Sequence, residues 1–251
     1  MRRFFISPEE LKENPPAISG PEATHITAVL RMKVGQRVTL FDGTGRDYDA
    51  AILSMSKKRV VFRILGQGSF PVKPFAPVTI AQALLKDGKM DLLVRQLTEL
   101  GIFELLPFSS ERSVANPDPA RMATRRNRWE KIVLEALKQC GRNIPLHIGS
   151  YTSFPEILVL GNQFVHKILF WEKEETPLQF PSPPFQDEPR LVLAVLGPEG
   201  GFSDREVSCA REYGFVTASL GPRILKAETA AVAASAILQY LFGDLFPQGL
   251  S

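Results

Sequence analysis

The sequence has few cysteines and histidines, and it has no long apolar run. Its two cysteines, Cys140 and Cys209, lie far apart in the 251-residue chain, so we expect no disulfide framework and a reducing cytoplasm as the setting. The three histidines are scattered without a Cys/His cluster, which predicts that there is no metal site. No apolar stretch reaches the roughly 20 residues that span a bilayer. The start, MRRFFISPEELKENPP, also lacks the apolar core of a secretory signal. We therefore expect a globular chain with no membrane partner.

Positive charge is unevenly distributed along the chain. The formal net charge is only +3, but residues 1–73 hold 12 of the 30 Lys and Arg residues against 7 of the 27 Asp and Glu residues. The segment RMATRRNRWEKIVLEALKQCGR (121–142) adds seven basic residues against two acidic ones. Such clusters suit a surface that binds a polyanion such as nucleic acid. Solvated surface charge explains them equally well, so charge alone leaves both interpretations open.

The first seventy residues read as a small β-rich domain. Short apolar or alternating runs predict strands, and turn residues separate them. A short helix is expected at 21–32, with Pro21 in its first turn. Several strands in so short a piece predict a small barrel, and the Pro- and Gly-rich GQGSFPVKPFAP (66–77) predicts a linker after it. The expected strands are 4–6, 37–41, 48–53 and 59–65.

After the linker, predicted strands and helices alternate. The helix at 203–214 has Ser203 as its N-cap and Glu206 three residues later, which together form a capping box. A proline-rich segment, 176–189, reads as an exposed loop. This alternation predicts an α/β domain with a mainly parallel sheet. The expected strands are 78–84, 102–108, 166–171, 190–197 and 215–221, and the expected helices are 90–101, 121–141, 203–214 and 228–242.

Two glycine-containing turns each follow an apolar strand near the C-terminus. They are LGPEGGFS (196–203) and LGPRILKAETA (220–230). Ligands of open α/β sheets bind at loops that leave the carboxyl ends of strands, and glycine lets a ligand approach the backbone closely. Neither turn matches the G-x-G-x-x-G or Walker A pattern. Two such turns on sequential strands favour one shared ligand pocket, and the alternative is that the glycines only serve tight turns.

The pair of turns resembles the C-terminal signature of the ribosomal RNA small-subunit methyltransferase E family. This family belongs to the SPOUT class of knotted methyltransferases and methylates N3 of a uridine in 16S ribosomal RNA. The resemblance covers essentially the whole chain. It includes the start MRRFF, the helix MDLLVRQLTELG, and the segments SSERSV (109–114) and EALKQCGRNIP (135–145).

The resemblance implies a fold, a cofactor and partners. It implies a PUA-like β-barrel RNA-binding domain at 1–70, followed by a trefoil-knotted α/β methyltransferase domain with a parallel sheet at 75–251. It implies S-adenosylmethionine as the cofactor and no metal. It also implies a cytoplasmic homodimer that acts on 16S rRNA, with the assembled 30S subunit as the expected substrate. The apolar helix 228–242 fits a dimer interface, although from its pattern alone an ordinary core helix is favoured.

Mapped onto this chain, the family's cofactor pocket is formed by three loops. Backbone amides and carbonyls of such loops can read an adenine edge, and apolar side chains can cover its faces. The residues implied in cofactor binding are Leu169, Phe170, Glu172, Leu196, Gly197, Glu199, Gly200, Gly201, Leu220, Gly221, Ile224 and Leu225.

Methylation at N3 of uridine requires removal of a proton or stabilisation of the resulting anion. Our hypothesis is that Glu228 or Glu199 assists deprotonation, while Lys226 or Arg112 stabilises the negative charge. The alternative is that both glutamates only cap nearby helix N-termini. Lys226 stands where the family is expected to have arginine, so the charge is kept without the planar five-donor fork.

Exposed arginines of the two basic regions are the candidates for phosphate contacts. Two other functions remain open: an RNA-binding protein that has lost catalysis, and a phosphate- or nucleotide-binding enzyme. The second would use the Gly200-Gly201 turn at the N-terminus of the Ser203 helix as an anion site. The RNA-binding candidates are Arg2, Arg3, Arg37, Arg125, Arg128 and Arg142, together with Lys57 to Arg59 and Arg112.

Overall fold

The computed structural model divides the chain into two compact units. Unit 1 comprises Met1–Lys73 with Leu134–Pro145, and unit 2 comprises Pro74–Val133 with Leu146–Ser251. A search of the described residues finds no helix that is long and apolar enough to cross a membrane. Most of the predicted linker at 66–77 and of the predicted loop at 176–189 lies outside the described residues. Those described are 2–68, 77–86, 88–114, 117–176, 178 and 191–245.

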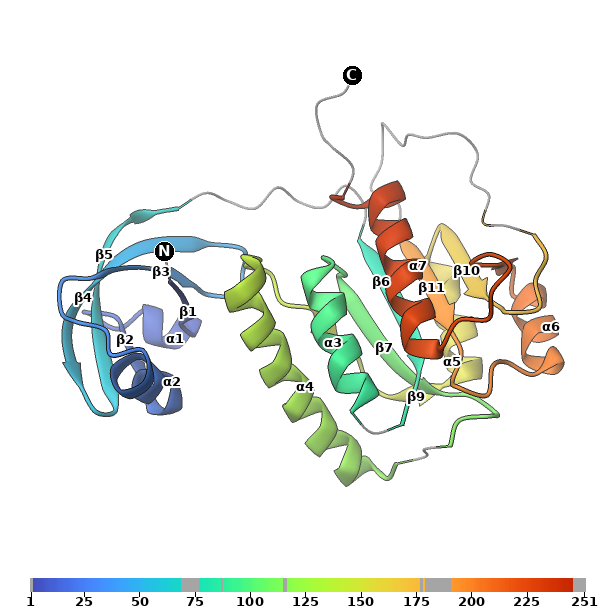
Figure 1. Cartoon of the computed structure of the whole chain (residues 1–251), viewed down its shortest axis with the longest axis horizontal. Helices are drawn as coiled ribbons and strands as arrows, with labels where there is room; N and C mark the ends of the chain where they lie inside the picture. The colour runs from blue at the N-terminus through green and yellow to red at the C-terminus, as the bar shows by residue number, and fades with distance from the viewer. Residues whose placement is uncertain are drawn as a thin grey trace, which may run out of the picture. The chain divides into compact units, whose positions relative to one another are not determined.

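Unit 1 is built on a five-stranded sheet, which confirms the predicted β-rich domain (Figure 1). The strand order is β1-β3-β4-β5-β2, with β1 parallel to β3 and the other pairs antiparallel. The sheet encloses a core that includes Phe4, Ile26 and Phe62. The helix predicted at 21–32 ends earlier, at Val29, and its second half is one π-helical turn. The elements are β1 (Arg3–Phe5), α1 (Pro8–Leu11), β2 (Ala17–Ser19), α2 (Gly20–Thr24), the π-helix (His25–Val29), β3 (Arg37–Phe41), β4 (Asp47–Ser56) and β5 (Arg59–Gln67).

Residues 134–145 belong to unit 1, although the sequence places them in the second domain at 75–251. Lys138 Nζ lies 2.7 Å from Glu22 Oε2. The Asn143 side chain donates a hydrogen bond to the carbonyl oxygen of Gly45 at 3.0 Å. Both contacts join residues about a hundred positions apart, which local sequence patterns do not report.

Unit 2 contains a parallel sheet of order β12-β10-β11-β6-β7-β8, with β9 also paired to β7. This confirms the predicted α/β fold. The strands are β6 (Val78–Ala83), β7 (Glu104–Ser109), β8 (His147–Ile148), β9 (Thr152–Ser153), β10 (His166–Phe170), β11 (Val192–Leu196) and β12 (Val216–Ala218). All five residues of β11 are buried, as expected for a parallel strand covered on both faces. The trefoil knot stays a prediction.

Helices cover both faces of this sheet (Figure 1). Leu169, Leu193 and Val195 pack with residues of α5 and α6 on one face, while α7 packs on β6 and β11 and against α3. The sequence pattern missed α5, although Ser153 and Glu156 form a capping box at its start. The helices are α3 (Lys89–Glu99), α4 (Pro119–Cys140), α5 (Phe154–Leu160) with a 3-10 turn (Gly161–Gln163), α6 (Asp204–Glu212) and α7 (Ala227–Phe242).

One face of α7 is a core face, as its apolar pattern predicts. Ala231, Ala234 and Leu238 are fully buried. The helix also presents an exposed apolar side, where Ile237 is 40% exposed and Tyr240 is 52% exposed. The structure thus confirms the core role of this helix, and its role in a dimer interface stays a prediction.

Candidate functional site

The candidate site lies where three neighbouring parallel strands end. Phe170, the last residue of β10, pairs with Leu196 of β11 and with Ala218 of β12. The three following loops therefore leave the sheet at the same level. Two of them are the glycine-containing turns of the sequence, and the third follows HKILFW, as expected. This edge of the sheet is where open α/β folds bind ligands.

A cavity of about 400 Å³ lies between these loops, within the size range of small-molecule sites. All the predicted cofactor residues except Leu169 line it: Phe170, Glu172, Leu196, Gly197, Glu199, Gly200, Gly201, Leu220, Gly221, Ile224 and Leu225. Leu169 has no exposed surface and packs in the core with the α5 and α6 residues. Side chains alternate between the two faces of a strand, so Leu169 points into that core while Phe170 reaches the cavity.

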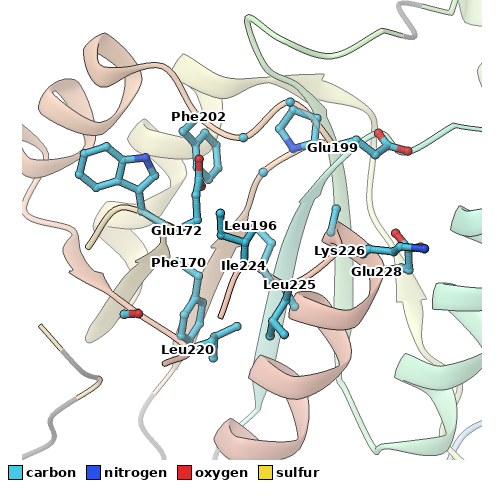
Figure 2. Close-up of a pocket in the computed structure, with 18 of the residues that line it drawn as sticks. Phe170, Glu172, Leu196, Glu199, Phe202, Leu220, Ile224, Leu225, Lys226 and Glu228 are labelled. Atoms are coloured by element: carbon cyan, nitrogen blue, oxygen red, sulfur yellow. The ribbon is translucent and has the colours of Figure 1, made fainter. Parts of the chain in front are cut away.

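The two ends of the cavity differ in chemistry (Figure 2). Phe170, Phe202 and Leu220 lie toward one end, where the Glu172 carboxylate is the charged group among the labelled residues. Lys226 and Glu228, at the start of α7, lie toward the other end, and Glu199 of the first glycine turn lies on the same side. The cavity can therefore cover a flat apolar group at one end and bind a charged or strongly polar group at the other.

A close backbone approach explains one glycine of the first turn. Gly201 has a φ of +66°, and a Cβ atom there would lie 2.5 Å from Glu172 Oε1. Glycine adopts this left-handed conformation without the steric cost that other residues incur. The absence of a side chain thus lets the Glu172 carboxylate lie directly against the turn, at the cavity wall.

Arg112 lies beside the same turn but is not among the residues that line the cavity. Its guanidinium donates a hydrogen bond to the carbonyl oxygen of Gly200 at 3.1 Å, and a Cβ on Gly200 would meet Arg112 Cβ at 3.1 Å. The structure therefore places Arg112 as a support of the turn.

The charged end contains an ion-pair cluster that the sequence analysis did not predict. Lys89 Nζ lies 3.1 Å from Glu199 Oε1 and 3.4 Å from Glu228 Oε2. The hydrogen bond to Glu199 is the largest cause that raises the pKa of Lys89. Burial pushes the pKa of Glu199 upward, but hydrogen bonds from the Lys86 backbone and from Lys89 outweigh it and lower that pKa. Lys89 and Glu199 each therefore favour the charged form of the other.

Two further residues hold the cavity walls and were also missed. Gln82 is fully buried, and its amide donates hydrogen bonds to the carbonyl oxygens of Gly197 at 2.9 Å and Ala83 at 3.0 Å. Trp171 lines the cavity, and the Lys173 and Arg211 cations lie 5.6 and 5.7 Å from its ring. The position of Trp171 directly after the strand HKILF was an available signal, whereas Gln82 resembled any strand residue.

Several of the predicted RNA-binding residues form contacts within the chain. Arg3 forms two hydrogen bonds to Asp47, at 2.6 and 3.2 Å, and donates a third to the carbonyl oxygen of Arg142. Its side chain is only 17% exposed. Arg128 forms an ion pair with Asp91 while remaining largely exposed. The other candidates are exposed (Arg2, Arg37, Lys57, Lys58 and Arg59, the last paired with Glu13) or half-buried (Arg125 and Arg142).

The expected lack of a metal site stays a prediction. Within the described ranges, no three His, Cys, Asp and Glu side chains group closely enough to hold a metal ion.

Two family models match the chain. Residues 71–239 match the RNA methyltransferase domain, and residues 18–65 match the RNA methyltransferase PUA domain. The chain is 31% identical to ribosomal RNA small subunit methyltransferase E of Bacillus subtilis, with 96% of each chain covered. It is also 31% identical to the enzyme of the same name from Buchnera aphidicola of Schizaphis graminum, with 88% of each covered.

Among solved structures, the chain is similar to a ribosomal RNA small subunit methyltransferase E from Neisseria gonorrhoeae bound to S-adenosyl methionine. The two are 28% identical with a TM-score of 0.82, and the match covers 98% of this chain and 99% of the other. The glycine turns, the parallel sheet and the PUA domain agree with these matches. The chain belongs to the ribosomal RNA small subunit methyltransferase E family of RNA methyltransferases.

Proposed function

We propose that this RNA methyltransferase transfers a methyl group from S-adenosylmethionine to N3 of a uridine in 16S rRNA, within the assembled 30S subunit. One observation carries the proposal. The loops after β10, β11 and β12 meet around one cavity, and eleven of the twelve residues that the family resemblance implies line it. The cofactor bound in the Neisseria relative supports the choice of ligand. The base and the N3 position rest on the family resemblance.

The residues present fit this cofactor. The apolar end, with Phe170 and Leu220, can cover the faces of adenine. Trp171 lines the cavity with a buried indole N–H that has no hydrogen-bond partner among the described residues. Glu172 lies against Gly201, where a carboxylate can accept hydrogen bonds from ribose hydroxyls. The charged end would then hold the amino-acid part of the cofactor or face the substrate base.

Bound S-adenosylmethionine supplies an electrophilic methyl group on a sulfonium. The chain must orient the uracil N3 toward that methyl group and accept the N3 proton. Glu199 is the weaker candidate for the base, because its carboxylate is engaged by Lys86 and Lys89 and its pKa is lowered. Glu228 Oε2 accepts no hydrogen bond among the described residues and has only the ion pair with Lys89 at 3.4 Å. We therefore assign the proton acceptor to Glu228.

Lys226 is the proposed cation that stabilises the anionic uracil. It is exposed at the cavity and is the N-cap residue of α7. The helix N-terminus adds a partial positive charge in the same direction. Arg112 is assigned a supporting role, because its guanidinium already bonds Gly200.

The proposed enzyme is a homodimer that binds RNA through both units. Ile224, beside the cavity, is 84% exposed, and α7 exposes Ile237 and Tyr240. Covering such apolar side chains with a second copy would stabilise a dimer. Arg2, Arg37 and Lys57 are the exposed cations of unit 1 assigned to phosphate contacts. The cytoplasm, where ribosomal subunits assemble, is the compartment that this substrate requires.

The alternative anion site at the Ser203 helix has little support. The N-terminus of α6 is already capped, because the Glu206 carboxylate accepts hydrogen bonds from the backbone N–H groups of Ser203 and Glu111 at 2.9 Å each. Asp204 adds a second negative charge in the first turn. A phosphate there would face two carboxylates.

The test combines purified 30S subunits or free 16S rRNA with the protein and labelled S-adenosylmethionine, followed by mass spectrometry of the digested nucleosides. We expect 3-methyluridine, formed faster on the 30S subunit. Label in another nucleoside would overturn the uridine assignment, and equal rates on free RNA would overturn the 30S assignment. For the base, Glu228→Gln should reduce the rate well beyond tenfold, or about 1.4 kcal/mol of barrier. A loss of tenfold or less would remove Glu228 from that role.

A further inference from the structure

The ion-pair cluster joins three segments that lie far apart in the sequence. Lys89 is the first residue of α3, Glu199 lies on the first glycine turn, and Glu228 lies in the first turn of α7. All three line the cavity. One ammonium group thus contacts both loops that hold the proposed cofactor. Nothing in the family resemblance assigned a role to this lysine.

The two carboxylates depend on Lys89 to different degrees. Glu199 Oε1 also accepts a hydrogen bond from the backbone N–H of Lys86 at 3.1 Å, so its position is fixed by the main chain as well. Glu228 Oε2 has less than 1 Å² of exposed surface and no hydrogen-bond partner in the part of the chain that the structure describes. Among the described residues, the ion pair with Lys89 is the one ion pair that Glu228 forms. Removing the lysine affects Glu228 most.

The charges of the cluster give Lys89 a second effect. The cluster carries one positive and two negative charges, and both carboxylates lie within 3.4 Å of the same Nζ atom. Arg223 and Lys226 also line the cavity, and no ion pair joins either of them to Glu199 or Glu228 among the described residues. Without Lys89 the carboxylates would repel each other, and this repulsion would push the glycine turn and the start of α7 apart.

We propose that Lys89 is a positioning residue of the methyl-transfer site, which holds the two cofactor loops together by bridging Glu199 and Glu228. This inference rests on the proposed function, since it takes the cavity as the cofactor site. The competing view is that Lys89 forms an ordinary surface ion pair, because its side chain is 38% exposed and such pairs contribute little. The two views differ in what happens to ligand affinity when only the lysine is changed.

The experiment is calorimetric titration with S-adenosylhomocysteine of the full chain and four variants. They are Lys89→Met, Lys89→Arg, the double variant Lys89→Met with Glu228→Gln, and Lys131→Met. Lys131 is an exposed lysine of α4 that forms no ion pair with any residue that the structure describes, and it serves as the matched control. Tryptophan fluorescence during urea unfolding shows whether each variant is folded before it is titrated.

Lys89→Met should weaken binding by about tenfold or more, and Lys89→Arg should stay within about threefold of the parent. The double variant should bind more tightly than Lys89→Met, because removal of one negative charge relieves the repulsion. If Lys89→Met does not fold, the comparison of the double variant with Lys89→Arg decides the question. The proposal then requires the double variant, which lacks the bridge, to bind more weakly than Lys89→Arg, and equal affinities would overturn it.

Parent-like binding by Lys89→Met would overturn the proposal, as would equal losses in Lys89→Met and Lys131→Met. Failure of Lys89→Arg to restore binding would overturn it as well. A parent protein that does not bind S-adenosylhomocysteine would instead refute the proposed function itself. The two failures are therefore distinguishable.

Discussion

Replacement of Gln82 by leucine tests how the first cofactor loop is held. Gln82 is fully buried, and its amide bonds the carbonyl oxygens of Ala83 and Gly197. The near-isosteric leucine leaves both carbonyl oxygens without this donor. Each loss should lower the free energy of unfolding by about 1–3 kcal/mol. The Gly197 oxygen should be near the low end of this range, because its hydrogen bond is only part-buried. Part of this is offset, because Gln82 Oε1 is itself buried without a hydrogen-bond partner among the described residues. We expect a net loss of about 1–3 kcal/mol of unfolding free energy.

The assay is urea unfolding followed by tryptophan fluorescence. Both tryptophans, Trp129 and Trp171, lie in unit 2, so the signal reports on the unit that contains Gln82. With a denaturant slope of about 2 kcal/mol/M, the unfolding midpoint should fall by about 0.5–1.5 M. Gln163→Leu, an exposed glutamine of the same unit, should change the free energy by less than about 0.5 kcal/mol.

The same variant should also bind S-adenosylhomocysteine less tightly, since the backbone of Gly197 loses its anchor to β6. A Gln82→Leu protein with the midpoint and the affinity of the parent would refute the reasoning. Loss of stability with unchanged affinity would show that the loop keeps its shape without this anchor.

Phe202→Ala should cost about 3–5 kcal/mol of unfolding free energy, because the ring is 1% exposed and packs on Phe154 at 5.6 Å between centroids. Phe103, which is 43% exposed, is the control. Its change to alanine should lower the free energy of unfolding by less than about 1 kcal/mol. Equal losses in the two variants would contradict the packing argument. The Thr217 hydroxyl is the largest cause that lowers the pKa of Glu174 from 4.5 to about 2. This stabilisation is present above pH 4.5 and is lost as the pH falls toward about 2, so Tm should fall less over that window in Thr217→Val than in the parent. Identical Tm profiles would remove Thr217 as the cause. Lys226→Arg should retain methyl transfer and Lys226→Met should lose it, as measured by initial rates; full activity in Lys226→Met would exclude a catalytic cation there.

Local sequence patterns predicted helices and strands well where the spacing of apolar residues is regular and capping residues mark the ends. The strand at 37–41 matches β3, and the capping box of Ser203 and Glu206 is present at the start of α6. The short strands β8 and β9 were missed, because two residues each are too few to show an alternation of apolar and polar side chains. The two glycine turns were identified because they combine an apolar strand with several unusual residues in a row.

Contacts between distant segments were beyond the reach of these patterns. Lys89 lies just before the helix predicted at 90–101, and only the fold brings it to Glu199 and Glu228. Arg3 was expected at an RNA phosphate, but its partner Asp47 is 44 positions away and holds the guanidinium within unit 1. Leu169 was placed in the pocket by its neighbours in sequence, whereas strand alternation turns it into the core. In each case the deciding interaction is tertiary.

The central claim is that the loops after β10, β11 and β12 form the S-adenosylmethionine site. The most direct test is calorimetric titration of the parent and of Gly200→Trp with S-adenosylhomocysteine. Gly200 lines the cavity, and even a Cβ there would lie 3.1 Å from Arg112 Cβ, so an indole must displace the turn or fill the site. We predict saturable binding of one ligand per chain by the parent and none by the folded variant. Equal binding by both proteins would contradict this location of the cofactor, and a folded parent that binds nothing would contradict the claim altogether.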